Sequence, residues 1–206
     1  MKILLLAGLL FPFSSSVNAQ TTAEEFFKEG QRKSIQSYGK EGGPAVVDAA
    51  IADLSRAIKL KPDYHDAYNF RGNMKAAKGD LEGAADDYSK AIELSTATAA
   101  YYGNRASVLK KKGDIKGALA DRKTVIKLRP KDGRGYMERG ELLVELEDYK
   151  GALADFDKGI ALAPELYVIR QKRAKAYRAL GQKDLADADE KRFAEEKAAF
   201  FEKLLR

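Results

Sequence analysis

The sequence repeats at every 34th position, and no other feature restricts its possible folds as strongly. Shifting the chain against itself by 34 positions aligns one alanine in five copies, at Ala50, Ala84, Ala118, Ala152 and Ala186. An aspartate recurs in the same five copies, at Asp53, Asp87, Asp121, Asp155 and Asp189. An arginine recurs in four copies, at Arg71, Arg105, Arg139 and Arg173. A period of roughly 20 to 50 residues is typical of stacked units that bury their apolar faces only against one another.

The order of residue types within one period predicts two helices joined by a tight turn. Glycine ends the first helix, because it adopts a left-handed backbone at the least cost, at Gly79, Gly113 and Gly181. An aspartate that caps the second helix follows, at Asp80, Asp114 and Asp148. Proline stops the second helix, at Pro62, Pro130 and Pro164. One copy carries Glu147 in the glycine column, and we expect its turn to close in a different way.

The arginine and aspartate columns stand at equal distances from the turn. Arg71 lies eight positions before Gly79 and Asp87 lies eight positions after it, and the later copies keep this spacing. A helical hairpin therefore brings the two side chains to the same height. Because the pair recurs in every copy, we interpret it as a structural ion pair between the two helices rather than as a functional charge ladder.

The two best copies read AYNFRGNMKAAKGDLEGAADDYSKAIEL and GYMERGELLVELEDYKGALADFDKGIALAP. This pattern resembles the tetratricopeptide repeat over Ala45 to about Ala188. The resemblance implies an all-α fold, a right-handed superhelical solenoid of helix-turn-helix repeats. We divide the chain into residues 1–19, a signal peptide; 20–64, a degenerate N-terminal repeat; 65–166, three tetratricopeptide repeats; and 167–206, a degenerate C-terminal repeat with a capping helix.

Composition excludes much chemistry. The 206 residues include no cysteine and one histidine, His65, so thiolate and histidine-rich metal sites are not available. No phosphate-binding loop or other catalytic motif is present. The 37 basic and 31 acidic residues are interspersed, which favours a solvated surface over a nucleic-acid-binding stripe. We therefore expect no enzyme activity, no cofactor, no metal and no nucleic-acid partner.

The N-terminal segment up to Ala19 has the layout of a secretory signal peptide. Lys2 is followed by an apolar run from Ile3 to Phe13, three serines and the small-residue segment Val17-Asn18-Ala19. The run is too short to span a membrane, which takes about 20 apolar residues. We expect cleavage after Ala19, a periplasmic or secreted mature protein, and no integral membrane segment after cleavage.

The resemblance implies a concave surface that is lined by the first helices and holds a peptide or a protein segment. Projected onto this chain, the candidate binding residues are Asn69, Asn73, Asn104, Lys110, Lys111 and Arg134. Some relatives clamp a terminal carboxylate, and Asn73, Asn104 and Arg134 fit that pattern, whereas Asn69 and Glu138 depart from it. The cations favour a protein or peptide partner of acidic character.

Two alternatives stay open at this point. The last helix carries a short apolar stripe of Phe200, Phe201, Leu204 and Leu205, which we expect to pack on Tyr177 or to form a homodimer. The protein would then be a self-associating structural protein. The other alternative is an accessory subunit of a cell-envelope enzyme.

One residue, Arg122, stands in an aromatic column, and we expect its aliphatic stem to lie along the core.

Overall fold

A computed structural model describes the backbone of residues 15–39 and 43–205 and the side chains from residue 22 onward. Most of the expected signal peptide, residues 1–14, lies outside the described residues. The described chain forms ten helices and no strand. They are α1 (Ser15–Ser37), α2 (Pro44–Leu60), α3 (His65–Lys78), α4 (Leu81–Leu94), α5 (Ala99–Lys111), α6 (Ile115–Leu128), α7 (Gly133–Glu145), α8 (Tyr149–Leu162), α9 (Val168–Ala179) and α10 (Lys183–Leu204).

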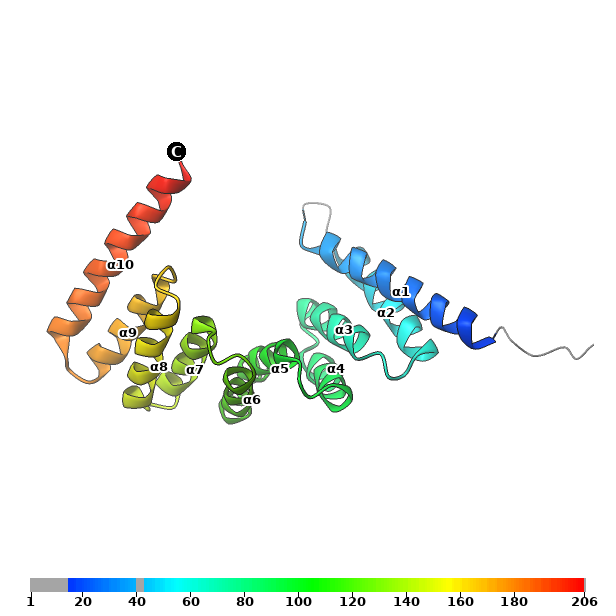
Figure 1. The fold of residues 1–206 in the computed structure, drawn as a ribbon, viewed down its shortest axis with the longest axis horizontal. Coiled ribbons are helices and arrows are strands. Elements are labelled where there is room, and N and C mark those ends of the chain that lie inside the picture. The colour runs from blue at the N-terminus through cyan, green and yellow to red at the C-terminus, as the bar shows by residue number, and fades with distance from the viewer. Residues whose placement is uncertain (1–14, 40–42, 206) are drawn as a thin grey trace, which may run out of the picture.

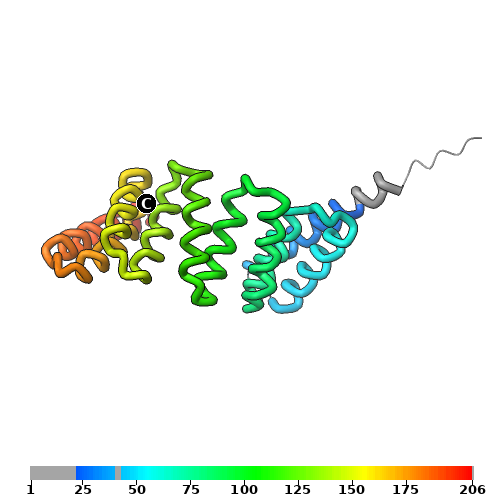
Figure 2. Tube along the Cα trace, turned by 90° about the horizontal axis from the view of Figure 1, so that it is seen from below, coloured from blue at the N-terminus to red at the C-terminus, as the bar shows by residue number. Residues whose placement is uncertain are grey.

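Consecutive helices pair into five hairpins that stack in chain order, so the predicted all-α array of helix-turn-helix units is confirmed (Figures 1 and 2). The odd-numbered helices form the inner row, because α1 contacts α3, α3 contacts α5 and α7 contacts α9. Among the described helices, even-numbered ones contact only odd-numbered ones. The inner row is open at one junction of the described chain, where the backbones of α5 and α7 do not come into contact.

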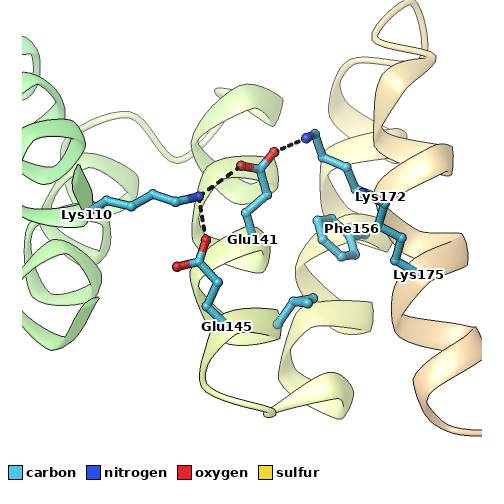
Figure 3. A pocket seen from close by; sticks show the side chains of 7 residues that line it. Lys110, Glu141, Glu145, Phe156, Lys172 and Lys175 are labelled. Atoms are coloured by element: carbon cyan, nitrogen blue, oxygen red, sulfur yellow. Dashed lines mark ion pairs between the residues drawn. The ribbon is translucent and has the colours of Figure 1, made fainter. Parts of the chain in front are cut away.

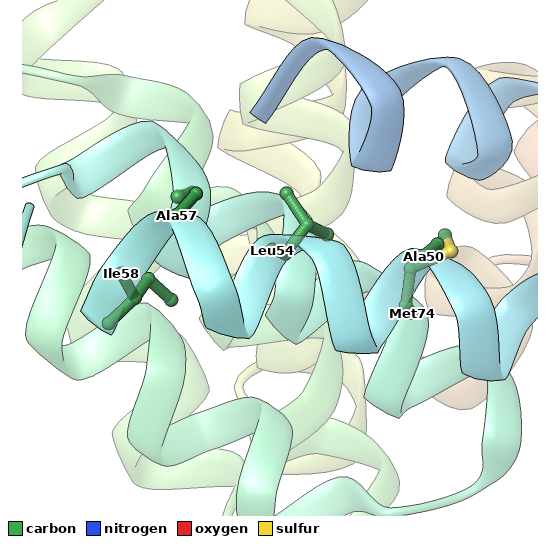
Figure 4. Packing of buried hydrophobic residues seen from close by; sticks show 6 residues of the cluster. Ala50, Leu54, Ala57, Ile58 and Met74 are labelled. Carbon is green, nitrogen blue, oxygen red and sulfur yellow. The ribbon is translucent and has the colours of Figure 1, made fainter. Parts of the chain in front are cut away.

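The core follows the alanine columns. The five alanines of the first column are fully buried, which lets the two helices of each hairpin approach closely. In the first hairpin, Ala50, Leu54 and Ala57 of α2 pack with Met74 of α3 (Figure 4). The stack thus buries small side chains of one hairpin against larger ones of the next.

The turns between the paired helices contain one departure from expectation. Gly79, Gly113 and Gly181 have the left-handed backbone, with φ of 86°, 85° and 73°. Glu147 adopts the same conformation at φ 60°. Its amide donates to the Val144 carbonyl at 3.0 Å and the next amide donates to the Leu143 carbonyl at 2.9 Å, as in the glycine turns. The expectation of a differently closed turn was wrong, because the capped helices on both sides impose one turn geometry.

A left-handed glutamate carries a conformational cost that glycine does not. We predict that Glu147→Gly raises the free energy of unfolding by about 1 kcal/mol, measured as a higher urea midpoint. The matched change Gly113→Glu places the same cost in the preceding turn and lowers the midpoint. A lower midpoint for Glu147→Gly would contradict this account of the turn.

The predicted arginine–aspartate pairs are confirmed in the four hairpins that carry this arginine, the second to the fifth. In the second hairpin, the Arg71 guanidinium donates from Nε and Nη2 to the two oxygens of Asp87 at 2.8 and 2.7 Å. Arg105–Asp121, Arg139–Asp155 and Arg173–Asp189 have the same forked geometry at 2.6–2.8 Å. These aspartates are buried, and the hydrogen bonds to them raise the pKa of each arginine, so the pairs stay charged.

Three of the four arginines also reach back to the preceding hairpin. Their Nη1 atoms bond an acceptor in the preceding second helix, at Ser55, Ser89 and Asp157. Lys123 occupies that position for Arg139, and a lysine ammonium offers no acceptor to the guanidinium. In these three repeats the arginine therefore joins three helices, whereas Arg139 joins only α7 and α8 and makes no such bond to α6.

Charge reversal tests whether the clip stabilises the fold. Arg105→Asp or Asp121→Arg alone leaves a buried, unpaired charge and should lower the free energy of unfolding by about 3 kcal/mol or more. The double reversal should recover part of that loss, with a coupling of about 0.5–3 kcal/mol in a double-mutant cycle from urea denaturation. Strictly additive losses would show that the two side chains do not interact.

Charged side chains cover the outer face of the last hairpin. Glu190 stands where the hairpin before it has Phe156, and it accepts from Arg178 at 2.7 and 3.0 Å. Asp187 accepts from the same guanidinium at 2.9 Å. A polar outer face of this kind prevents a further repeat from stacking.

The terminal apolar stripe contacts α9, the helix of Tyr177, as predicted, but at its opposite end, where Tyr167 is the N-cap residue. Phe193 and Phe200 lie against Tyr167, with ring centroids 5.7 and 5.8 Å apart, rather than against Tyr177. The reason is the length of the two helices. Tyr177 lies near the turn, and α10 is so much longer than α9 that its C-terminal half lies beyond Tyr177. The rest of the stripe stays exposed.

Candidate binding groove

The same repeat positions form the contacts between neighbouring helices of the inner row, but the residue types at these positions differ from one junction to the next. Between α3 and α5, Asn104 donates to Asn69 at 2.9 Å and to Asn73 at 3.2 Å. The hydroxyl of Tyr88 donates to Asn73 at 2.8 Å, and burial raises the pKa of Tyr88 so that this proton is kept. The three predicted asparagines therefore do lie together, with their amides bonded to one another.

The equivalent positions one repeat later form the open junction between α5 and α7. Glu138 replaces Asn104, Ser107 replaces Asn73, Gly103 replaces Asn69 and Arg122 replaces Tyr88. The guanidinium of Arg122 bridges the gap, with Nη1 2.7 Å from a Glu138 oxygen and Nη2 2.9 Å from the Ser107 hydroxyl. Glycine and serine are too small to fill the space that the asparagines fill, so a cavity remains.

The next junction along the stack, between α7 and α9, is crossed by an ion pair of Glu141 with Lys172 at 2.5 Å. The other oxygen of Glu141 lies 3.6 Å from Lys110 of α5, and Lys110 also pairs with Glu145 at 2.7 Å (Figure 3). Glu141 thus connects three helices of the inner row. Burial alone would lower the pKa of Lys110, but the two glutamates outweigh it and raise that pKa.

Three cavities lie next to one another along these junctions, and we call them together the groove. The first, of about 190 Å³, and the second, of about 410 Å³, share Ser107, Arg122 and Glu138. The second and the third, of about 180 Å³, share Lys110, Glu141 and Glu145. The groove crosses the inner face from the start of α5 to the end of α9, and Leu142 and Phe156 contribute to its lining.

The charges of the groove do not balance. Its three glutamates, Glu138, Glu141 and Glu145, each have a basic partner, and burial raises the pKa of Glu138 against the opposing effect of Arg122 and Arg134. Four cations in or beside the groove have no carboxylate partner among the described residues: Lys111, Arg129, Arg134 and Lys175. Against these four stands one further acid in the lining, Asp132, which caps α7 by accepting from the Arg134 amide, so the remaining charge of the groove is positive.

The predicted site residues divide between two places. Lys110 and Lys111 line the groove near the end of α7, whereas Arg134 is exposed in the first turn of that helix. The asparagine cluster lies at the preceding junction. The charged end of Arg122 faces the groove. The residues that sequence reasoning missed, Glu145 and Lys172, are found by following the inner columns repeat by repeat.

The described residues contain no cluster of side chains that could hold a metal ion. Within the same part of the chain, no helix is both long enough and apolar enough to cross a membrane.

Comparison with known proteins agrees with this geometry. Residues 72–113 match the family described as TPR repeat, and residues 104–166 match that described as Tetratricopeptide repeat. No curated protein matches the chain in sequence. Residues 72–166 therefore carry tetratricopeptide repeats, a kind of repeat that is generally non-catalytic and typically mediates protein–protein interaction.

Solved structures share the fold at low identity. MamA 41-end from Desulfovibrio magneticus RS-1 superposes with a TM-score of 0.78 at 18% identity, covering 86% of this chain and 96% of that one. YrrB, described as a TPR protein with an unusual peptide-binding site, gives 0.73 at 17% identity, covering 89% and 94%. PilF of Pseudomonas aeruginosa gives 0.71 at 15% identity, covering 87% and 78%.

Proposed function

We propose that the protein is a non-catalytic scaffold that binds an acidic peptide or protein segment in the groove over α5, α7 and α9. The observation that carries the proposal is the open inner junction. Asparagine amides fill the junction between α3 and α5, whereas the junction between α5 and α7 is crossed by the ion pairs of Lys110 and Arg122 and retains cavities lined with charge. The peptide-binding site for which YrrB is described gives the same fold a precedent.

The excess of unpaired cations supports an acidic partner. A carboxylate entering the groove meets Lys111 or Lys175 without breaking an ion pair of the stack. A basic segment would have to displace Lys110 or Arg122 from their glutamates first. Such binding weakens with salt, because exposed charges are screened.

A matched pair of variants tests the groove. Lys111, Arg134 and Lys175 changed together to glutamate should weaken binding about tenfold or more, since three exposed pairs at about 0.5 kcal/mol each sum to that factor. The control changes Lys116, Lys127 and Lys150 to glutamate, which alters the net charge equally. These three lysines lie exposed on α6 and α8 and have no carboxylate partner in the part of the chain that the structure describes. The measurement is capture of proteins from an extract of the producing cells, with circular dichroism as the check on folding.

Equal losses in both variants would mean that net charge, not the groove, governs binding. Loss in the control variant alone would move the site to the outer face. Either result would contradict the proposed site.

We also propose that the protein acts after export, as the N-terminal sequence indicates. Sequencing of the mature protein from the cell envelope or medium should begin at Gln20. The apolar run before Val17 is what a signal peptidase substrate requires. A product that starts at Met1 and stays in the cytoplasm would contradict export.

A further inference from the structure

The end of α10 exposes apolar side chains that the described chain covers only in part. Leu205 is 87% exposed, Leu204 is 70% exposed, and Phe200 and Phe201 are about half exposed. Four large apolar residues within six positions form a contiguous patch, whereas soluble monomers mostly expose such residues singly. The patch lies where α10 has run past the end of α9 (Figure 1).

The stack shows what kind of element fits this face. Ala194 occupies the position that Ile160 has one repeat earlier, and Ile160 packs in the cluster formed by Phe156 of α8 and Ile169 of α9. In each earlier repeat, a following helix covers this face. On α10, the first half of the face is capped by Glu190 and Arg178, and the second half is left apolar. The open half is therefore shaped for another helix.

The apolar half of α10 is complementary to itself. Ala194, Ala198, Phe201 and Leu205 follow one another at steps of four, three and four, so they form one exposed stripe. In an antiparallel pair of α10 helices, Ala198 lies opposite Phe201 of the second copy and Ala194 lies opposite Leu205 of the second copy. Every layer then joins a small residue to a large one, as knobs-into-holes packing requires.

We propose that the protein forms a two-fold symmetric dimer through antiparallel packing of the C-terminal halves of α10. The same patch serves both copies, as symmetry demands. Because the two helices overlap only near their ends, the two stacks extend away in opposite directions.

Sedimentation equilibrium tests the dimer. The wild-type protein should be dimeric at micromolar concentration, and Phe201→Glu with Leu205→Glu should be monomeric with its helical circular dichroism retained. The matched control is Ile35→Glu, since Ile35 of α1 is 68% exposed at a distant place and its change should leave the dimer intact. A wild-type monomer up to about 100 µM, well above typical specific affinities, would overturn the proposal.

Disulfide cross-linking tests the register, and the chain has no cysteine to interfere. Ala194→Cys mixed with Leu205→Cys should cross-link, because antiparallel packing brings these positions together. Each variant alone should not, because its own cysteines lie about 16 Å apart along the pair. Cross-linking of Ala194→Cys with itself would indicate parallel packing and contradict the proposal.

A monomer that sediments with phosphatidylglycerol vesicles, and no longer does so after Phe201→Glu, would make a lipid surface the occupant instead.

Discussion

The stack depends on one interaction, the forked ion pair between a first-helix arginine and a second-helix aspartate. Each pair lies at the centre of its hairpin, nearly out of contact with water on the aspartate side. A buried carboxylate is costly without a partner, so the pair fixes the register of the two helices. In three of four repeats the same guanidinium also bonds the preceding hairpin. The exception, Arg139, belongs to α7, the helix whose inner junction is open.

Because these pairs hold the hairpins together, the residues of the inner face can differ between repeats. The alanine, arginine and aspartate columns hold the hairpins, while the columns of Asn73, Asn104 and Tyr88 change identity at every step. Amides close the junction between α3 and α5, glycine and serine leave the junction between α5 and α7 open, and a lysine–glutamate pair crosses the junction between α7 and α9. The groove is therefore a local consequence of which small or charged residues follow one another at equivalent positions.

The sequence predicted the fold well because the fold is periodic. Hairpins, the arginine–aspartate pairs and the aspartate caps all follow from residues that recur at every 34th position, and Asp80, Asp114 and Asp148 do cap their helices. Glu147 shows the limit of residue-by-residue reasoning, since its neighbours impose a left-handed turn on an unfavourable residue. The site was predicted only in part, because contacts such as Lys110–Glu145 and Arg122–Glu138 depend on the spacing between neighbouring helices. The position of Phe200 depended likewise on how far α10 overruns α9.

The central claim is that a constant frame presents a variable inner face, and that binding occurs where this face is open. Hydrogen–deuterium exchange on the protein with and without a bound partner tests it most directly. The account predicts new protection in peptides from α5, α7 and α9, with exchange in α4, α6 and α8 unchanged. Protection confined to α4, α6 and α8 would contradict it, because binding would then occur on the outer helices.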